Sequence, residues 1–134
     1  MSRRRVREVI LQIIFQIDYY KEGFDENAFN YMEEQNIPEE EQTYIREFVE
    51  DLIKNKETID ETIGKHLKSW TIGRLSKIDL AILRVSTYEM LLREDIPKKV
   101  SMNEAIELTK RFSDEESSKF VNGVLDSIAN SRDE

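Results

Sequence analysis

The chain has 134 residues, and its formal net charge is −8 because 28 acidic side chains outnumber 20 basic ones. This length suits one domain, and we expect residues 1–134 to form it. The chain has no cysteine and a single histidine, which excludes disulfide scaffolds, cysteine nucleophiles, thiolate metal centres and multi-histidine metal sites. Net charge alone also argues against a protein that binds nucleic acid.

The charge is unevenly distributed along the chain. Residues 1–21 carry a net charge of +3, residues 22–61 carry −11, and the basic and acidic groups of residues 62–134 balance. Acidic helix surfaces that keep a protein in solution explain the middle segment. The basic N-terminus instead indicates a polar partner at one end of the chain.

The apolar run that follows the N-terminal arginines is interrupted by Glu8, Gln12, Gln16 and Asp18. No small-residue cleavage site follows it, so the run does not resemble a signal peptide. No apolar stretch approaches the roughly 20 residues that cross a bilayer as a helix. We therefore expect a soluble, cytoplasmic protein that makes no contact with a membrane.

Apolar residues recur at helical spacing through nearly the whole chain. In the first segment, such a stripe comprises Val6, Val9, Ile10, Ile13 and Ile17. The segment from about residue 76 to 93 is apolar on more than one side, which predicts a buried central helix. No strand-like alternation competes with this pattern. The sequence therefore predicts an all-α fold, a compact bundle of about seven helices.

Three pairs of a serine and an acid, spaced three residues apart, predict helix starts. In a capping box the serine and the acid each accept a hydrogen bond from the other's backbone amide. We expect one helix to begin at each pair. The pairs are Ser76 with Asp79, Ser101 with Glu104, and Ser113 with Glu116.

No arrangement of residues indicates catalysis. His66 has no nucleophile motif near it, and the four glycines do not form a phosphate-binding loop. Carboxylates are abundant, but helix caps and solvated helix faces account for nearly all of them. We therefore expect a binding protein rather than an enzyme, with no metal and no cofactor.

Arg3, Arg4, Arg5 and Arg7 form the strongest local signal in the sequence. On a helix, Arg3, Arg4 and Arg7 share one face. Cations at a helix N-terminus oppose the helix dipole, so stability does not explain them. Guanidinium groups match phosphate oxygens, which favours an RNA or DNA partner. A frayed, solvated terminus is the alternative.

The segment from Lys119 to Asp126 is the second unusual feature. A glycine inside a helix, as at Gly123, costs about 1 kcal/mol relative to alanine. Either another helix packs closely on Gly123, or a partner approaches the backbone there, with Asn122 offering hydrogen bonds. Lys119 and Phe120 combine a cation with an aromatic ring, as in sites for single-stranded bases. Core packing is the alternative for Phe120.

Four motifs are distributed along nearly the whole chain, namely Arg3-Arg4-Arg5-x-Arg7-Glu8, Ile78-Asp79-x-Ala81-Ile82-Leu83-Arg84, Asn103-Glu104-Ala105-Ile106-Glu107-Leu108 and Lys119-Phe120-Val121-Asn122-Gly123-Val124-Leu125-Asp126. In this order and spacing, they resemble the NusB family of bacterial transcription antitermination factors. The resemblance implies a helical fold that binds the single-stranded boxA RNA of nascent ribosomal-RNA transcripts. It also implies a partner, NusE (a small-subunit ribosomal protein), with which the protein helps RNA polymerase resist premature termination.

The resemblance also implies roles for individual residues. Toward NusE it points to Phe15 and Asp79, where relatives often carry Tyr and Glu, and we add Tyr19, one turn beyond Phe15. Glu116 is expected to temper RNA affinity, because a carboxylate repels phosphate. The residues expected to contact or border the RNA are Arg3, Arg4, Arg5, Arg7, Arg84, Glu116, Lys119, Phe120 and Asn122.

A second class of function stays open from the sequence. In a non-enzymatic protein–protein scaffold, the arginine-rich end would dock acidic proteins or a second copy of the chain. Some relatives self-associate and cover the RNA surface, so a homodimer belongs to this alternative. Light scattering and RNA titration at low and high salt distinguish the two classes, since phosphate binding weakens with salt.

Overall fold

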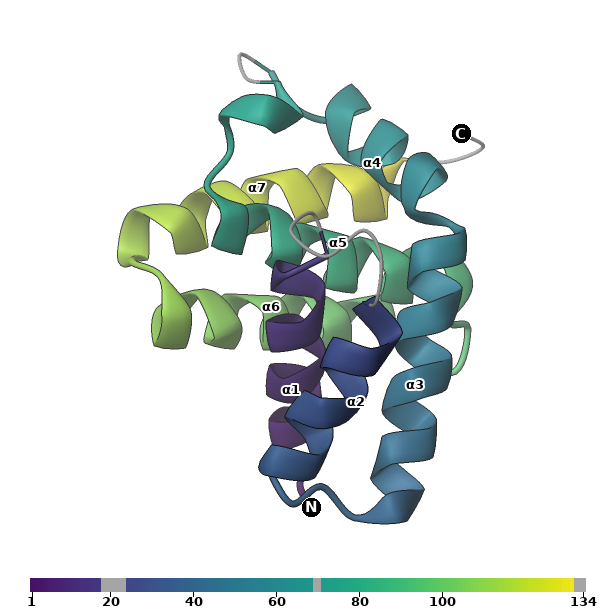
Figure 1. The fold of residues 1–134 in the computed structure, drawn as a ribbon. Helices are drawn as coiled ribbons and strands as arrows, with labels where there is room; N and C mark the ends of the chain where they lie inside the picture. Colours follow the sequence, from purple (N-terminus) through teal and green to yellow (C-terminus); the bar gives the residue numbers. More distant parts are fainter. Residues whose placement is uncertain (18–23, 69–70, 132–134) are drawn as a thin grey trace. The chain divides into compact units, whose positions relative to one another are not determined.

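The structure is a computed structural model that describes residues 1–17, 24–68 and 71–131. Those residues contain seven α-helices, one short 3-10 helix and no strand, which confirms the all-α prediction (Figure 1). None of the helices described is long and apolar enough to cross a membrane. Tyr19, a predicted partner contact, lies outside the described residues.

The chain divides into two compact units, Met1–Lys54 and Asn55–Glu134. The expectation of a single domain stays a prediction.

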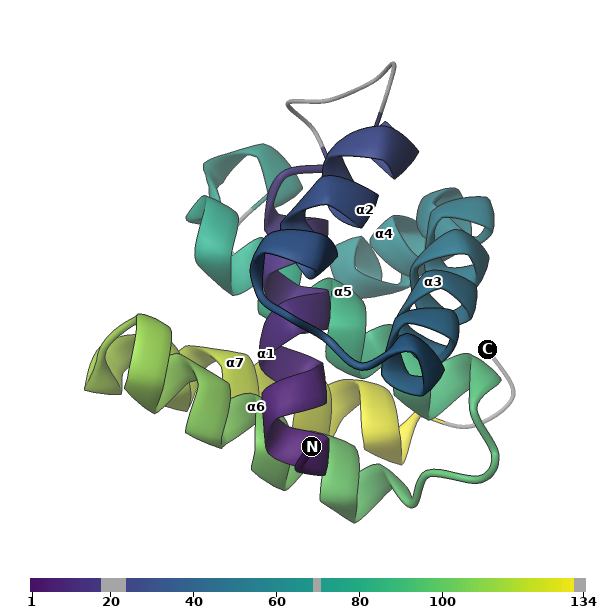
Figure 2. The ribbon, with the colours of Figure 1, turned by 60° about the horizontal axis from the view of Figure 1, so that its bottom comes forward.

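The first unit contains α1 (Arg3–Phe15), α2 (Phe24–Glu34) and α3 (Glu39–Lys54), with α1 packed on both of the other helices (Figure 2). Ser2 caps α1, because its hydroxyl accepts a hydrogen bond from the Arg5 amide at 3.1 Å. The predicted apolar stripe of α1 is buried from Val6 to Ile13. The buried side of α3 consists of Ile45, Phe48, Val49 and Leu52.

The second unit is built around α5 (Lys77–Leu92), which packs on α4 (Lys56–Lys65), α6 (Lys98–Phe112) and α7 (Glu115–Asn130). A 3-10 helix, η1 (Ile72–Arg74), precedes α5. Every residue from 79 to 90 is buried. This confirms the predicted central helix and the reason for it, a helix that is apolar on more than one side.

The capping predictions were right at one of the three helix starts. Ser76 caps α5, and its hydroxyl accepts a hydrogen bond from the Asp79 amide at 3.1 Å. The prediction for Ser113 was wrong by one residue. Asp114 caps α7 instead, and its carboxylate accepts from the Ser117 amide at 2.7 Å. A carboxylate there also complements the positive end of the helix dipole.

The third predicted cap, Ser101, was wrong for a different reason. The helix starts earlier, at Lys98, so Ser101 lies inside α6. Its buried hydroxyl donates a hydrogen bond to the Glu89 carboxylate of α5 at 2.7 Å. A buried carboxylate requires such a donor, so the contact between helices determines the role of this serine rather than the local pattern.

Thr87 of α5 is fully buried, and its hydroxyl has no hydrogen-bond partner among the described residues. Leaving a buried hydroxyl unpaired is unfavourable by about 1–3 kcal/mol. We predict that Thr87→Val, which keeps the shape and removes the hydroxyl, raises the free energy of unfolding in urea by about 1 kcal/mol. The control is Thr43→Val on α3, an exposed site that should change stability by less than about 0.5 kcal/mol. A loss of stability in Thr87→Val would contradict the prediction.

Candidate nucleic-acid and partner interfaces

The four N-terminal arginines of α1 differ in exposure. Arg3 and Arg4 are exposed, Arg5 is partly buried, and Arg7 is only 9% exposed. Phosphate binding needs guanidinium groups that a ligand can reach. The structure therefore divides the predicted motif into an exposed pair, Arg3 and Arg4, and two arginines that are partly or fully covered.

Arg5 makes specific contacts with its surroundings in the first unit. Its guanidinium donates a hydrogen bond to Oε1 of Gln35 at 2.8 Å and forms an ion pair with Glu8 at 3.5 Å. Burial raises the pKa of the Tyr31 phenol, while the positive charge of Arg5 acts in the opposite direction. Arg5 thus links α1 to the C-terminal end of α2, in addition to any contact with a ligand.

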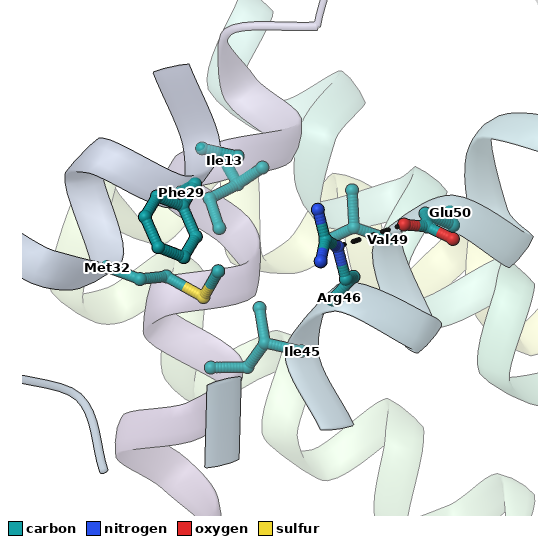
Figure 3. Close-up of a pocket in the computed structure, with 8 residues that line it drawn as sticks. Ile13, Phe29, Met32, Ile45, Arg46, Val49 and Glu50 are labelled. Carbon is teal, nitrogen blue, oxygen red and sulfur yellow. Dashed lines mark ion pairs between the residues drawn. The ribbon is translucent and has the colours of Figure 1, made fainter. Parts of the chain in front are cut away.

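Phe15, the predicted partner contact of the first unit, is the last residue of α1 and is partly exposed. Separately, a hollow of about 20 Å³ lies among α1, α2 and α3, with the ion pair of Arg46 and Glu50 beside it (Figure 3). This volume holds about one water molecule. Neither Phe15 nor the predicted RNA-binding residues line the hollow, which is too small for a base or a large side chain.

A larger cavity, of about 270 Å³, lies in the second unit. It brings together residues with different predicted ligands, namely Asp79 for the protein partner and Glu116 and Phe120 for RNA. The sequence patterns did not identify Arg74 or Ser117 as neighbours of these residues, because no motif relates η1 to α7. The cavity is lined by Arg74, Leu75, Ser76, Asp79, Asp114, Glu116, Ser117 and Phe120.

Asp79 is held in place by hydroxyl groups. The side chain is 8% exposed, and its Oδ2 accepts a hydrogen bond from Ser117 Oγ at 2.9 Å. Ser113 Oγ lies 2.9 Å from Ser117 Oγ and 3.4 Å from Asp79 Oδ1. Hydrogen bonds from hydroxyl groups fix the orientation of a carboxylate. The predicted partner residue is thus an oriented acid at the wall of the cavity.

The remaining predicted RNA residues lie along α7. Lys119 and Asn122 are exposed and share a helix face, while Phe120 is partly buried. Apart from the chain neighbours of Gly123 and the backbone of its own helix, no described residue lies within 4 Å of the position that a Cβ on Gly123 would occupy. Close packing of another helix on Gly123, one of the two sequence-based explanations, is therefore wrong. The approach of a partner to the backbone remains.

Arg84 does not fit an RNA-binding role in this structure. The residue is only 4% exposed, and its Nε and one terminal nitrogen donate to the two carboxylate oxygens of Asp60 at 2.8 and 2.9 Å. Lys56 adds an ion pair to the same carboxylate at 3.1 Å. This two-pronged contact uses the geometry that would otherwise bind phosphate. We therefore leave Arg84 out of the proposed RNA surface.

These features define a class of protein, small all-helical chains with a basic first helix and an acid-lined cavity at the start of a buried helix. Within the described ranges, no cluster of three or more metal-ligating side chains occurs. The chain belongs to the NusB family, whose model matches residues 4–130. This confirms the resemblance seen in the sequence.

Relatives named transcription antitermination protein NusB match nearly the full chain. The protein from Clostridium novyi is 47% identical over 93% of this chain and 96% of its own length. The protein from Acetivibrio thermocellus is 44% identical, over 96% of this chain and 88% of its own length. The similarity to these relatives thus extends over more than nine-tenths of this chain.

Solved structures agree with the fold. NusB of T. maritima superposes with a TM-score of 0.87 at 35% identity, covering 98% of this chain and 92% of that chain. A chain from the crystal structure of antitermination factors NusB and NusE in complex with dsRNA gives a TM-score of 0.85 at 29% identity. That match covers 96% of this chain and 98% of the other.

The structural role of Arg84 is testable. Arg84→Ala leaves the Asp60 carboxylate without its main partner, so the free energy of unfolding in urea should fall by about 3 kcal/mol. The free energy of unfolding should fall less in Arg84→Lys, which keeps the charge and loses the paired geometry. The RNA affinity of folded Arg84→Ala should stay within about twofold of wild type, since surfaces remote from a change usually keep their energetics. A stable variant that has lost RNA binding would restore the RNA role of Arg84.

Proposed function

We propose that this protein is a non-enzymatic antitermination adaptor. It binds the single-stranded boxA element of nascent ribosomal-RNA transcripts together with NusE, and it supports processive transcription by RNA polymerase in the cytoplasm. Family membership along nearly the whole chain is the observation that carries this proposal. The solved relative described with NusE and RNA supports both partners.

RNA contacts are proposed on each unit. In the first unit, the exposed guanidinium groups of Arg3 and Arg4 pair with phosphate oxygens. In the second unit, the ring of Phe120 stacks on an unpaired base, while Lys119 and Asn122 supply charge and hydrogen bonds. In this proposal the arginines contribute affinity for RNA, and the residues of α7 contribute the preference for its sequence.

The contact with NusE is proposed at Phe15 and Asp79. Phe15 offers an apolar ring without the hydroxyl that relatives often carry there, so its contribution is packing rather than a hydrogen bond. Asp79 offers a carboxylate whose orientation Ser117 fixes, at 2.9 Å. An oriented carboxylate suits a cationic or hydrogen-bond-donating group of the partner.

The arginine contacts predict a specific salt dependence. If the two exposed arginines neutralise one phosphate each on a single strand, they contribute about −1.4 to the slope of log affinity against log salt. Replacing the exposed pair, Arg3→Ala with Arg4→Ala, should make that slope shallower by about 1.4. The measurement is a titration of boxA RNA over a series of salt concentrations.

The matched control removes the same charge from α3 of the same unit, through Arg46→Ala with Lys54→Ala, two exposed residues. This control should keep the wild-type slope. Equal slopes for wild type and the Arg3 and Arg4 variant would remove these arginines from the RNA site. Tighter binding of a boxA duplex than of the single strand would overturn the single-strand preference and leave RNA binding in place.

Gly123 gives a prediction with opposite signs for stability and binding. Because a methyl group there meets open space, Gly123→Ala should raise the free energy of unfolding by up to about 1 kcal/mol. The same methyl group should weaken RNA binding several-fold, because it blocks approach to the backbone. The control is Gly64→Ala on α4, where a Cβ makes only an ordinary 4.0 Å contact with Ile72. Unchanged RNA affinity in Gly123→Ala would show that no ligand approaches that backbone.

A further inference from the structure

The 270 Å³ cavity is lined by residues for two different proposed ligands. Asp79 reaches it from the first turn of α5 and is the proposed contact for NusE. Glu116 and Phe120 reach it from α7 and are proposed to border the RNA. We propose that Ser117 is a positioning residue that couples partner binding at Asp79 to RNA binding at α7, an inference that rests on the proposed function.

Ser117 is bonded in two directions. Its hydroxyl donates to Asp79 Oδ2 at 2.9 Å, which ties it to the acid of α5. Its backbone amide donates to Asp114 Oδ1 at 2.7 Å, which fixes it in the capped first turn of α7. Asp79 is 8% exposed, and hydrogen bonds to a carboxylate in such surroundings are stronger than in water. A change at the carboxylate therefore acts directly on the start of α7.

The carboxylate keeps capacity for another donor. A carboxylate accepts about four hydrogen bonds, and Ser117 occupies one position on Oδ2. The Ser113 hydroxyl, which lies 2.9 Å from Ser117 Oγ and 3.4 Å from Asp79 Oδ1, supports the same arrangement from the turn before α7. Ser117 thus holds Asp79 in one orientation before a partner arrives, which reduces the ordering that binding requires.

Ser117 also lies close to the residues of α7 that are proposed to border the RNA. Glu116 is its neighbour in sequence and Phe120 follows about one helical turn later, and both line the same cavity. The first turn of α7 therefore places Asp79, Glu116 and Phe120 with respect to one another. A partner that fixes Asp79 also fixes the residues that the RNA meets.

Electrostatics favours positive coupling, in which the bound partner raises the affinity for RNA. The cavity wall contains the carboxylates of Asp79, Asp114 and Glu116 and a single arginine, Arg74, so it repels phosphate. A cationic group bound at Asp79 offsets part of this negative charge and makes the approach of RNA more favourable. Coupling of this kind is reciprocal, so RNA raises the affinity for the partner by the same factor.

The test measures the dissociation constant of boxA RNA with and without saturating NusE, and takes the ratio as the coupling factor. Wild type should show a factor of at least about five. Ser117→Ala should bring the factor close to one, while Ser117→Thr, which keeps the hydroxyl, should retain most of it. The matched control is Ser127→Ala, an exposed serine of the same helix whose hydroxyl lies 2.7 Å from His66 Nδ1, and it should keep the wild-type factor.

A coupling factor that is unchanged in Ser117→Ala overturns the inference, even if that variant melts at a lower temperature. If Ser117→Ala does not fold, as judged by its helical spectrum, Ser113→Ala replaces it and should lower the factor in part. No reduction in Ser113→Ala would then overturn the inference. Wild type that binds both ligands without coupling also overturns it and leaves the proposed function intact. Wild type that binds neither overturns the proposed function itself.

Discussion

The burial of α5 is the constraint on which the second unit depends. Every residue from 79 to 90 is buried, so the polar side chains in this range, with the exception of Thr87, are paired inside the protein. Arg84 is paired with Asp60, and Glu89 accepts a hydrogen bond from Ser101. These contacts fasten α5 to α4 and to α6, beyond the apolar packing that brings the helices together.

The same constraint determines where binding groups occur on this helix. Asp79 lies at its N-terminal end, beside the cavity, where the carboxylate is hydrogen-bonded by Ser117 and still borders open space. Polar residues further along α5, such as Arg84 and Glu89, instead bond to neighbouring helices and stabilise the fold. The proposed ligand contacts of the second unit therefore come from the start of α5 and from α7, whose outer face carries exposed residues such as Lys119 and Asn122.

Helical spacing was sufficient to predict the all-α fold and the buried central helix, because both follow from the periodicity of apolar residues. The cap at Ser76 was also predictable, since it depends on residues three apart. The error at Ser101 and the ion pair of Arg84, which the sequence did not indicate, share one physical cause. Each side chain bonds a group on another helix, Glu89 and Asp60 respectively, and no local pattern contains that information.

For the candidate site, the sequence supplied residues, which stay predictions, but not their arrangement. The sequence indicated Arg3, Phe120 and Asp79 through the family resemblance and through residue types that suit RNA or a partner. It did not indicate that Asp79 and Phe120 border one cavity, or that Ser117 hydrogen-bonds to Asp79. Those facts depend on the packing of α5 against α7, which brings together residues about 40 positions apart in the chain.

The cap at Ser2 has a consequence for how the basic terminus works. Many arginine-rich segments are disordered and fold only on RNA, so part of their interaction energy is lost to ordering. Here the Ser2 hydroxyl and the bond from Arg5 to Gln35 hold the first turn of α1 in helical form without a ligand. The backbone that carries the arginines is thus helical before any ligand binds. If Arg3 and Arg4 bind RNA as proposed, recognition at this end is docking onto a preformed helical turn, and the entropy of ordering that backbone is already lost in folding.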